Sequence, residues 1–579
     1  MGVSYACAQD IVLEDPFAPI KEEISQTTKI LTFEARRISA KYPSETINPA
    51  GMNYPGYRGA GQLVVYYPNF RHSTGTNEFG FEAVVENGVV VKLTGADSII
   101  PRNGFVVSGH GSSKTWIKNN LKIGTNVLID GNTIIAYTTP DSVLYTAKAK
   151  IKEAEEFIEN IKRSEIKADE NNKRAAFYLK KAKNELKKAE KAREQVKRSY
   201  ANSSIEFSNL AIKYSLPYLE NEFKGVWIRP TEQNISAVRQ TLDNIKAVGI
   251  KEVFLETYFH GYTIYPSNVM RSYGLTVQNP KFITYDPLKA YVTEAHKRGL
   301  KVHCWFESFY IGNNNPLMDE KSILSVYPTW GNKNFANYDS TGFVPHRTEH
   351  NGYFLDPANP EVVEFLTQLL NELSSQYNID GINLDYTRYP TSTASNVSSY
   401  KQSNWGYTEY ARNEFKELYE IDPVDIKLSD EALWEKWSEY RQNKLYEYVK
   451  KARETVNREI LLSAVIFPDY SVCLETKQQD WAKWSRDNLI DAMTPLIMTS
   501  DNELFEKILK EVKMRASHKT DIYTGLFVGF LDAEPEDLLR QISVSRAMKT
   551  GGIVLFDWAH LPAKYQSALK SRVFSQKKN

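Results

Sequence analysis

Cysteine is scarce in this chain, whose 579 residues include only Cys7, Cys304 and Cys473. Three is an odd number, which excludes a complete disulfide framework, and no two of them form a C-x-x-C pair of the kind that binds zinc or carries redox chemistry. Long apolar stretches are also missing, because no run reaches the roughly 18 residues that suggest a membrane-spanning helix. We therefore expect no structural zinc, no redox motif and no membrane span. The sequence leads us to assign no metal ligand and no cofactor, and whether a structural calcium is bound stays open.

An excess of charge of either sign is missing as well. The sequence has 72 Lys and Arg residues against 71 Asp and Glu residues, so its formal net charge is +1. Proteins that bind nucleic acid through bulk electrostatics carry a clear basic excess, and this balance argues against a nucleic-acid partner. Hydrophobic residues make up 42% and charged residues 25% of the chain, which is typical of a globular protein and excludes a mostly disordered one.

The first residues look like the end of a signal peptide. Ala6, Cys7 and Ala8 form an A-x-A triplet of the type that signal peptidase cleaves, although no basic and apolar regions precede it. We expect residues 1–20 to be a signal-peptide remnant or a linker. Two alternatives stay open: a chance triplet of small residues, and a lipoprotein-type cysteine at Cys7. A signal peptide or a lipoprotein would place the protein outside the cytoplasm, secreted or associated with the cell envelope.

Short β-branched and aromatic runs dominate residues 21–140, where glycine, asparagine and proline separate them. Such runs predict strands joined by tight turns. We therefore expect a small β-rich N-terminal domain over this range. Its strands are expected within GQLVVYYPNF, FEAVVENGVVVKL, GFVVSGHG and TNVLIDGNTIIAYT.

Residues 141–215 follow a different pattern, in which apolar residues recur at intervals of three and four. This spacing predicts the seam between two packed helices. The polar segment EIKADENN separates the two periodic stretches and predicts the turn of a coiled-coil-like helical hairpin. Between residues 146 and 200 there are 17 Lys and Arg against 10 Asp and Glu. This basic face could contact an anionic cell-wall polymer or membrane, but a solvated surface is the simpler explanation.

Eight short apolar runs alternate with amphipathic stretches over residues 224–579. Asn359-Pro360 is typical of a helix start, and Gly249 and Gly299 are typical of helix ends. Runs that are apolar throughout fit parallel strands buried on both faces. The chain is therefore expected to be α/β, with a (β/α)8 TIM barrel after the β-rich domain and the helical hairpin. The runs are GVWIRP, EVFLETYF, KVHCWFESF, GINLDYTRYP, ILLSAVIFPD, DAMTPLIMTS, IYTGLFVGF and GGIVLFDWAH.

Carboxylates are frequent at the carboxyl ends of these runs, where a TIM barrel places its chemistry. Glycoside hydrolysis needs two of them: one protonates the leaving oxygen, and the other attacks, activates water or stabilises the developing positive charge. No nucleophile elbow, phosphate-binding glycine loop or H-E-x-x-H motif points to another chemistry. The candidate catalytic residues are Asp385, Asp469, Glu307 and Glu256.

Other polar and aromatic side chains at the strand ends are candidates for binding substrate. Aromatic rings can stack on sugars, and polar groups can bond their hydroxyls. Simpler alternatives stay open, since the aromatic residues and His303 could pack in the core and Asp385 could form a structural ion pair with Arg388. The candidates are Arg229, Tyr258, His260, His303, Trp305, Tyr386, Arg388, Asp501, Asp557 and Trp558.

Residues 224–560 resemble the barrels of glycosyl-hydrolase-like family 10 (GHL10). The resemblance rests on GVWIRP, ETYFHG, HCWFES, FLDPANPEV, YNIDGINLDYTRYP, IFPD with QQDWAKW, and IVLFDW, in this order. It implies a bacterial protein, secreted or attached to the envelope, and associated with glycan hydrolysis, in some members of peptidoglycan strands. It also implies that Asp385 is the family's signature aspartate, and that Asp356 in FLDPANPEV orders a turn or contacts substrate.

Two further segments carry shorter resemblances. ENGVVVKLTGADSIIPRNGFVVSGHG resembles part of the phosphodiester-glycosidase-like domains, where His110 could act in catalysis or could simply lie in a turn. YNIDGINLDYTRYP also resembles the chitinase frame D-G-x-D-x-D-x-E, but Asn383 and Thr387 stand where two of its acids belong. That departure argues against ordinary chitinase chemistry.

We therefore expect a glycoside hydrolase that cleaves O-glycosidic bonds of a bacterial cell-envelope or extracellular polysaccharide, such as peptidoglycan-type glycan strands. Its expected partner is that polysaccharide, and the sequence predicts no oligomeric state. Because function lies in sites rather than in folds, three alternatives stay open: a barrel that binds glycans without cleaving them, a phosphodiester glycosidase in the N-terminal domain, and an envelope scaffold acting through the helical hairpin.

Overall fold

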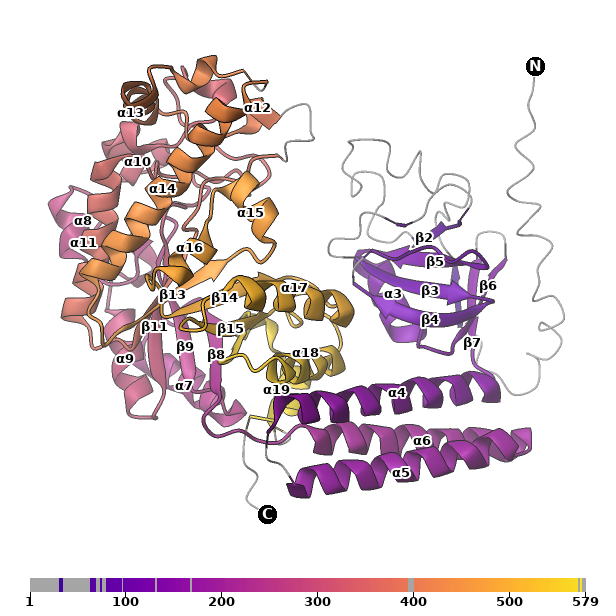
Figure 1. The fold of residues 1–579 in the computed structure, drawn as a ribbon. Coiled ribbons are helices and arrows are strands. Elements are labelled where there is room, and N and C mark those ends of the chain that lie inside the picture. The colour runs from indigo at the N-terminus through magenta and orange to yellow at the C-terminus, as the bar shows by residue number, and fades with distance from the viewer. Residues whose placement is uncertain are drawn as a thin grey trace, which may run out of the picture. The chain divides into compact units, whose positions relative to one another are not determined.

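The computed structural model describes residues 31–34, 63–68, 73–74, 80–95, 97–130, 133–166, 169–393, 400–427, 429–570 and 573–574. The chain forms two compact units, drawn in Figure 1: Met1–Pro217 with Thr499–Leu504, and Tyr218–Met498 with Phe505–Asn579. The expected signal-peptide remnant or linker, residues 1–20, lies outside the described residues.

The first unit contains a seven-stranded antiparallel sheet of order β1-β7-β6-β4-β3-β5-β2, which confirms the expected β-rich region. Strands β3 and β4 meet at a tight turn formed by Asn87 and Gly88, both with positive φ (48° and 74°). Asparagine and glycine tolerate this conformation best, so the sequence specifies the turn locally. The elements are β1 (Leu31–Glu34), β2 (Leu63–Tyr66), β3 (Phe81–Glu86), β4 (Val89–Thr94), β5 (Gly104–Gly109), α3 (Gly111–Asn120), β6 (Asn126–Asp130) and β7 (Thr133–Tyr137).

Three packed helices follow the sheet: α4 (Pro140–Ser164), α5 (Asp169–Lys191) and α6 (Glu194–Ser215). The expected turn at EIKADENN separates α4 from α5, but the chain breaks again before α6, so the prediction of a two-helix hairpin is corrected to three helices. The buried face of α6 includes small residues such as Ala201 and Ser204, and Ser204 Oγ donates to the carbonyl of Ala182 at 2.9 Å. Small polar residues allow close packing but add little to an apolar pattern, so the periodicity missed this helix.

The second unit is a closed barrel of eight parallel strands, as expected. Each strand pairs with the next one along the chain, and β16 pairs with β8 to close the ring. Each strand coincides with one of the eight apolar runs. They are β8 (Phe223–Ile228), β9 (Glu252–Phe259), β11 (Lys301–Glu307), β12 (Gly381–Asp385), β13 (Leu461–Ile466), β14 (Ala492–Ile497), β15 (Asp521–Leu526) and β16 (Gly552–Leu555), with β10 (Tyr262–Thr263) paired antiparallel to β9.

The barrel helices begin and end at the expected signals. The Asn359 side chain accepts the N–H of Glu361 at the start of α11, where Pro360 is the first residue. Helix α7 ends at Gly249, whose φ of 97° is left-handed and whose missing Cβ leaves room for the Phe574 carbonyl. The helices are α7 (Ile235–Val248), α8 (Asn268–Ser272), α9 (Pro287–His296), α10 (Ile323–Val326), α11 (Pro360–Gln376), α12 (Tyr400–Ser403), α13 (Glu409–Tyr419), α14 (Glu431–Thr455), α15 (Tyr470–Lys477), α16 (Trp481–Arg486), α17 (Asn502–Arg515), α18 (Pro535–Ala547) and α19 (Ala563–Lys570).

Large aromatic side chains fill the barrel interior. Trp227, Phe254 and Trp305 belong to one buried cluster, and Phe223 stacks on Tyr523 with the ring centroids 3.7 Å apart. Burying a side chain of this size stabilises the fold by about 1.5–3 kcal/mol. This apolar layer therefore holds the strands whose carboxyl ends carry the polar groups.

Cys304 and Cys473 are both buried and both free. Burial raises the pKa of each thiol to about 12, so both are protonated at neutral pH. Among the described residues, none of the helices combines the length and the apolar composition that crossing a membrane requires.

Candidate active site

Four carboxylates gather at the carboxyl ends of the barrel strands. Glu256 lies on β9, Glu307 and Asp385 are the last residues of β11 and β12, and Asp557 follows β16. Glu307 is the register partner of Asp385, and Glu256 is that of Trp305. Partners in a parallel ladder project to the same face of the sheet. The closed barrel thus turns residues far apart in the sequence into neighbours.

Arg229, which follows β8, links two of these carboxylates. Its Nε lies 3.2 Å from Glu256 Oε1, and its Nη1 lies 2.7 Å from Asp557 Oδ2. Its guanidinium carbon also lies 4.8 Å from the centroid of the Trp305 ring. Because both carboxylates are buried, the cation offsets the cost of removing them from water. The Arg229 side chain is itself 46% exposed, so it can also reach a bound ligand.

Asp385 is held by two hydrogen bonds, one to each of its oxygens. Trp305 Nε1 donates to Oδ2 at 2.8 Å, and the backbone N–H of Tyr386 donates to Oδ1 at 2.6 Å. Burial raises the pKa of Asp385, and the two hydrogen bonds act in the opposite direction because they favour the ionised form. Trp305 was expected to stack on sugar. Instead it is buried and orients this carboxylate.

The substitution Trp305→Phe tests this orientation. Phenylalanine fills most of the same space but cannot donate to Asp385, so we expect the pKa of Asp385 to rise and kcat to fall about tenfold, the equivalent of one hydrogen bond to a charged group. The acidic limb of the pH–rate profile should move to higher pH. An unchanged profile would show that Trp305 only fills the core.

Glu307 and Glu256 are both buried. Burial raises the pKa of Glu307 well above its ordinary value, and the charges of Glu256 and Asp385 raise it further, although the backbone N–H of His260 donates to its Oε2 at 3.0 Å. Burial also raises the pKa of Glu256 to about 7, against the opposing charge of Arg229. The raised pKa favours the protonated form of Glu307, which suits a residue that donates a proton.

Arg388 was expected to hold substrate, but it is buried and bound to Glu349. Its Nη1 and Nη2 lie 3.1 and 2.5 Å from the two oxygens of that carboxylate. Its guanidinium also lies 4.8 Å from the centroid of the Tyr386 ring, which stacks on Tyr310. Glu349 escaped the sequence reasoning because it lies in the long segment after β11 and not at a strand end. Arg388 therefore packs against the Tyr386 ring, and both of its terminal nitrogens are already bound to Glu349 and not available to a ligand.

Removal of one partner of this pair is expected to destabilise the fold. Burial by itself would raise the pKa of Glu349, but the charge and hydrogen bonds of Arg388 hold it well below its ordinary value of 4.5. The pair therefore stabilises the fold above about pH 4.5, and this contribution is lost as the pH falls. We expect Arg388→Met to cost about 3–5 kcal/mol in urea unfolding at pH 7. A cost below about 1 kcal/mol would contradict this role.

His560 was not among the candidates, although it follows Asp557 by three residues in the short 3-10 helix η7 (Trp558–His560). Its Nδ1 lies 2.6 Å from Asp557 Oδ1. Asp557 thus joins His560 to Arg229 and, through it, to Glu256. The candidate Trp558 is partly exposed in the same helix, and it stays a prediction as a stacking residue.

Two expected acids have structural roles instead. Asp469 is exposed and caps α15, where its carboxylate accepts the N–H of Val472 at 3.1 Å. Asp501 caps the start of α17 by accepting the N–H groups of Glu503 and Leu504, both at 3.0 Å, and its segment belongs to the first unit. Aspartate is a preferred helix cap. Both acids follow their strand by several residues, and a sequence cannot distinguish such a cap from a catalytic acid.

Two expected binding residues lie in the core. His303 is buried, with Nε2 2.9 Å from Glu252 Oε2 and its ring stacked on Phe254. It precedes Glu307 by four residues, or about 13 Å of strand, and therefore lies towards the opposite end of the barrel. Tyr258 is fully buried because a register shift pairs it with Phe306, on which its ring packs.

Asp356 also has a structural role. It is fully buried and accepts hydrogen bonds from Thr408 Oγ1 at 2.6 Å and from the N–H of Ala358 at 3.0 Å. These bonds fix the turn that leads into α11. Burial raises its pKa to about 6.

In the first unit, His110 caps α3, which agrees with its interpretation as a turn residue.

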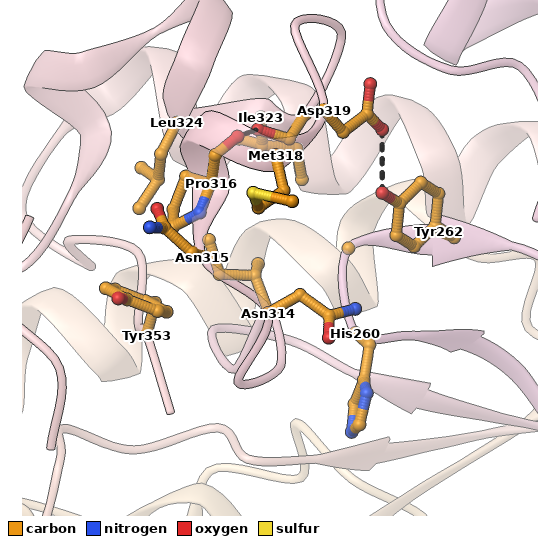
Figure 2. Close-up of a pocket in the computed structure, with 13 residues that line it drawn as sticks. His260, Tyr262, Asn314, Asn315, Pro316, Met318, Asp319, Ile323, Leu324 and Tyr353 are labelled. Carbon is orange, nitrogen blue, oxygen red and sulfur yellow. Dashed lines mark hydrogen bonds between the residues drawn. The ribbon is translucent and has the colours of Figure 1, made fainter. Parts of the chain in front are cut away.

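A cavity of about 360 Å³ is lined in part by His260, the residue that follows β9. His260 links this cavity to Glu307, because its backbone N–H donates to the Glu307 carboxylate and the residue is part of the cavity lining. In Figure 2, Tyr262 and Asp319 form one side of this cavity, and Tyr353 and Leu324 form the opposite side. The cavity is within the size range of small-molecule sites.

The described residues include no group of three or more His, Cys, Asp or Glu side chains arranged to hold a metal ion. The chemistry that this cluster offers is proton transfer between carboxyl groups. Glu307 can give a proton, and Asp385 can attack or accept one.

A profile of the family described as Glycosyl hydrolase-like 10 matches residues 222–534, which is more than half of the chain. The chain belongs to the glycosyl hydrolase-like 10 family. This match begins at β8 and ends just before α18. It therefore covers Glu256, Glu307 and Asp385, while Asp557 lies beyond it. Family and fold together support a carbohydrate-active TIM barrel.

Two curated relatives carry glycosyl hydrolase names. Glycosyl hydrolase DigH of Escherichia coli (strain K12) is 30% identical over 199 residues, which are 31% of this chain and 42% of that protein. Glycosyl hydrolase YngK of Bacillus subtilis (strain 168) is 26% identical over 202 residues, which are 30% of this chain and 36% of that protein. The similarity thus covers less than half of either relative. Among solved structures, the PgaB (BpsB) glycoside hydrolase domain of Bordetella bronchiseptica has a TM-score of 0.44 at 12% identity, covering 62% of this chain and 99% of that one.

Proposed function

We propose that the protein is a glycoside hydrolase that cleaves O-glycosidic bonds of a bacterial cell-envelope or extracellular polysaccharide, with peptidoglycan-type glycan strands as the first candidate. We also propose that it is secreted or envelope-associated, because such polymers lie outside the cytoplasm. Family membership supports the reaction class. Fractionation of the cells that produce the protein checks the location, and recovery in the cytoplasm would contradict it.

The pair formed by Glu307 and Asp385 carries this proposal. Burial and neighbouring charges raise the pKa of Glu307 well above its ordinary value and so favour its protonated form. Asp385 accepts two hydrogen bonds that favour its ionised form. Burial raises the pKa of both carboxyl groups, but only Asp385 has a hydrogen bond to each oxygen that favours its ionised form, so this pair suits the acid and the nucleophile or base of glycoside hydrolysis. In this mechanism Glu307 protonates the leaving oxygen, and Asp385 attacks the sugar or activates water.

The chain of His560, Asp557, Arg229 and Glu256 supports the same reaction. Its polar groups lie at the carboxyl ends of β16, β8 and β9, next to the reacting pair. Arg229 and His560 are partly exposed, so they can bond sugar hydroxyls. Because Arg229 and His560 are bonded to the buried carboxylates Glu256 and Asp557, their side chains are held in fixed positions for contact with a sugar.

A panel of glycans tests the reaction. Purified protein is incubated with intact peptidoglycan, peptide-stripped glycan strands and poly-N-acetylglucosamine, and the products are identified by mass spectrometry beside the variant Asp385→Asn. New reducing-end oligosaccharides that disappear in the variant would support the proposal. Binding of one glycan without any product would contradict it and indicate a glycan-binding barrel instead.

A further inference from the structure

We propose that the cavity lined by His260 is a subsite for an uncharged sugar unit and that it disfavours units carrying a carboxylate or phosphate. The inference rests on the proposed function, since it takes the ligand to be a glycan. We call this cavity the neutral-sugar subsite. It is lined by His260, Gly261, Tyr262, Ile311, Asn314, Asn315, Pro316, Met318, Asp319, Ser322, Ile323, Leu324 and Tyr353.

His260 links the cavity to one of the reacting groups, and the cavity wall is closely packed at this residue. His260 has a φ of 51°; its backbone N–H donates to Glu307, and the residue is part of the cavity lining. Gly312 has a φ of 85°, and a Cβ at this position would lie 2.7 Å from His260 Cβ. Only glycine allows this approach. The segment after β11 is thus fixed against the turn after β9, and His260 connects this part of the cavity wall to Glu307.

The lining combines an apolar half with uncharged polar groups. Ile311, Pro316, Ile323 and Leu324 supply apolar surface, and the side chain of Met318 adds to it although the residue is 84% exposed. Asn314 and Asn315 bring amide groups to the same cavity. Apolar surface suits the C–H face of a sugar or an acyl methyl, and amides bond hydroxyl or amide groups. This combination fits a neutral sugar.

The electrostatics of the lining disfavour an anion. None of the lining residues is Lys or Arg, and one is the carboxylate of Asp319, which accepts hydrogen bonds from Tyr262 Oη at 2.7 Å and from Thr276 Oγ1 at 3.2 Å. Burial and the charge of Arg229 lower the pKa of His260, so its ring is neutral at pH 7. An anionic sugar would therefore meet a carboxylate and no cation in the cavity wall.

The two arginines near the reacting carboxyl groups do not compensate for this, although the exposed Lys281 is close enough for its charge to lower the pKa of His260. Arg229 is paired with Glu256 and Asp557, and Arg388 is paired with Glu349. Their charges are already matched by carboxylates, so an incoming anion gains little from them. A like-charge contact in a partly desolvated site weakens binding, and one such charge is enough to change an affinity about tenfold.

Calorimetric titration of the Asp385→Asn variant tests the inference without turnover. The probes are a hexamer of N-acetylglucosamine and the same hexamer with each C6 hydroxymethyl group oxidised to a carboxylate. We expect the neutral hexamer to bind at least about tenfold more tightly. Equal or tighter binding of the oxidised hexamer would overturn the inference, and so would binding of neither hexamer.

Two lysine variants test whether the preference for the neutral hexamer arises within the cavity. Asn314 is exposed and lines the cavity, whereas Asn313 is exposed on the same loop but is not part of the lining. In the Asp385→Asn background, Asn314→Lys should reduce the preference for the neutral hexamer about tenfold, and Asn313→Lys should leave it within about twofold. Equal effects of the two lysines would overturn the inference.

The two proposals can fail separately. Wild-type protein that releases products from the glycan panel, while its Asp385→Asn variant binds both hexamers equally, is a hydrolase without the neutral-sugar subsite. Wild-type protein that releases nothing, while the variant prefers the neutral hexamer, has the subsite but not the proposed activity.

Discussion

Replacement of Asp385 by asparagine is expected to lower kcat by at least about 1,000-fold, within the range for loss of a positioned acid or base. Asparagine has nearly the same size and can still accept one of the two hydrogen bonds from Trp305 and Tyr386. It cannot carry the negative charge that attack on the sugar or activation of water requires. The measurement is the initial rate on the glycan that the panel identifies.

A matched control separates this effect from a general loss of acid groups. Asp469 is an exposed helix cap, and asparagine caps helices about as well as aspartate. Asp469→Asn should therefore keep turnover within about twofold and stability within about 0.5 kcal/mol. Turnover by Asp385→Asn, or its loss in Asp469→Asn, would contradict the assignment. Both variants should melt cooperatively, which shows that the fold is intact.

Replacement of Glu307 by glutamine is expected to lower kcat by about 100- to 10,000-fold on natural glycans, because glutamine cannot protonate the leaving oxygen. The decrease in kcat should be much smaller for substrates whose leaving group needs no proton, such as aryl glycosides of acidic phenols. Wild-type activity should fall as the pH rises through the raised pKa of Glu307, and this alkaline limb should be missing from the variant. A limb that persists in Glu307→Gln would assign the acid to another residue.

The same substitution should change the pH dependence of stability. The pKa of Glu307 in the folded protein is raised above its ordinary value of 4.5. Its contribution to stability is therefore fully present below about pH 4.5 and is lost as the pH rises through the raised pKa. Compared with wild type, Glu307→Gln should gain in free energy of unfolding as the pH rises above about 4.5. Parallel curves for the two proteins in urea unfolding would contradict the buried, protonated state of Glu307.

Local sequence signals predicted the architecture because they report local geometry. The eight apolar runs became the eight barrel strands, and Asn359-Pro360 and Gly249 mark a helix start and a helix end. The same reasoning placed Glu256, Glu307 and Asp385 near one another, since all parallel strands present their carboxyl ends on one side of a barrel. The spacing of three and four also located α4 and α5, but it missed α6, whose packed face includes serine and alanine.

Local sequence signals could not predict contacts between residues that lie far apart in the sequence. Arg229 and Asp557 lie 328 positions apart and meet only because β16 closes the ring against β8. Arg388 is paired with Glu349 from a long connecting segment whose path no periodicity describes. A one-residue register shift buries Tyr258. The role of such a side chain depends on which residues from distant parts of the sequence the fold brings into contact with it.

Residue type and spacing were thus enough to establish the barrel, the sheet domain and the set of acids from which the reacting pair is drawn. They could not separate acids that cap helices, Asp469 and Asp501, from acids that are register partners at the ends of neighbouring strands, Glu307 and Asp385. The difference is physical: a helix cap is satisfied by the next few residues of its own chain segment, whereas the protonation state of Glu307 depends on burial and on charges brought by other strands.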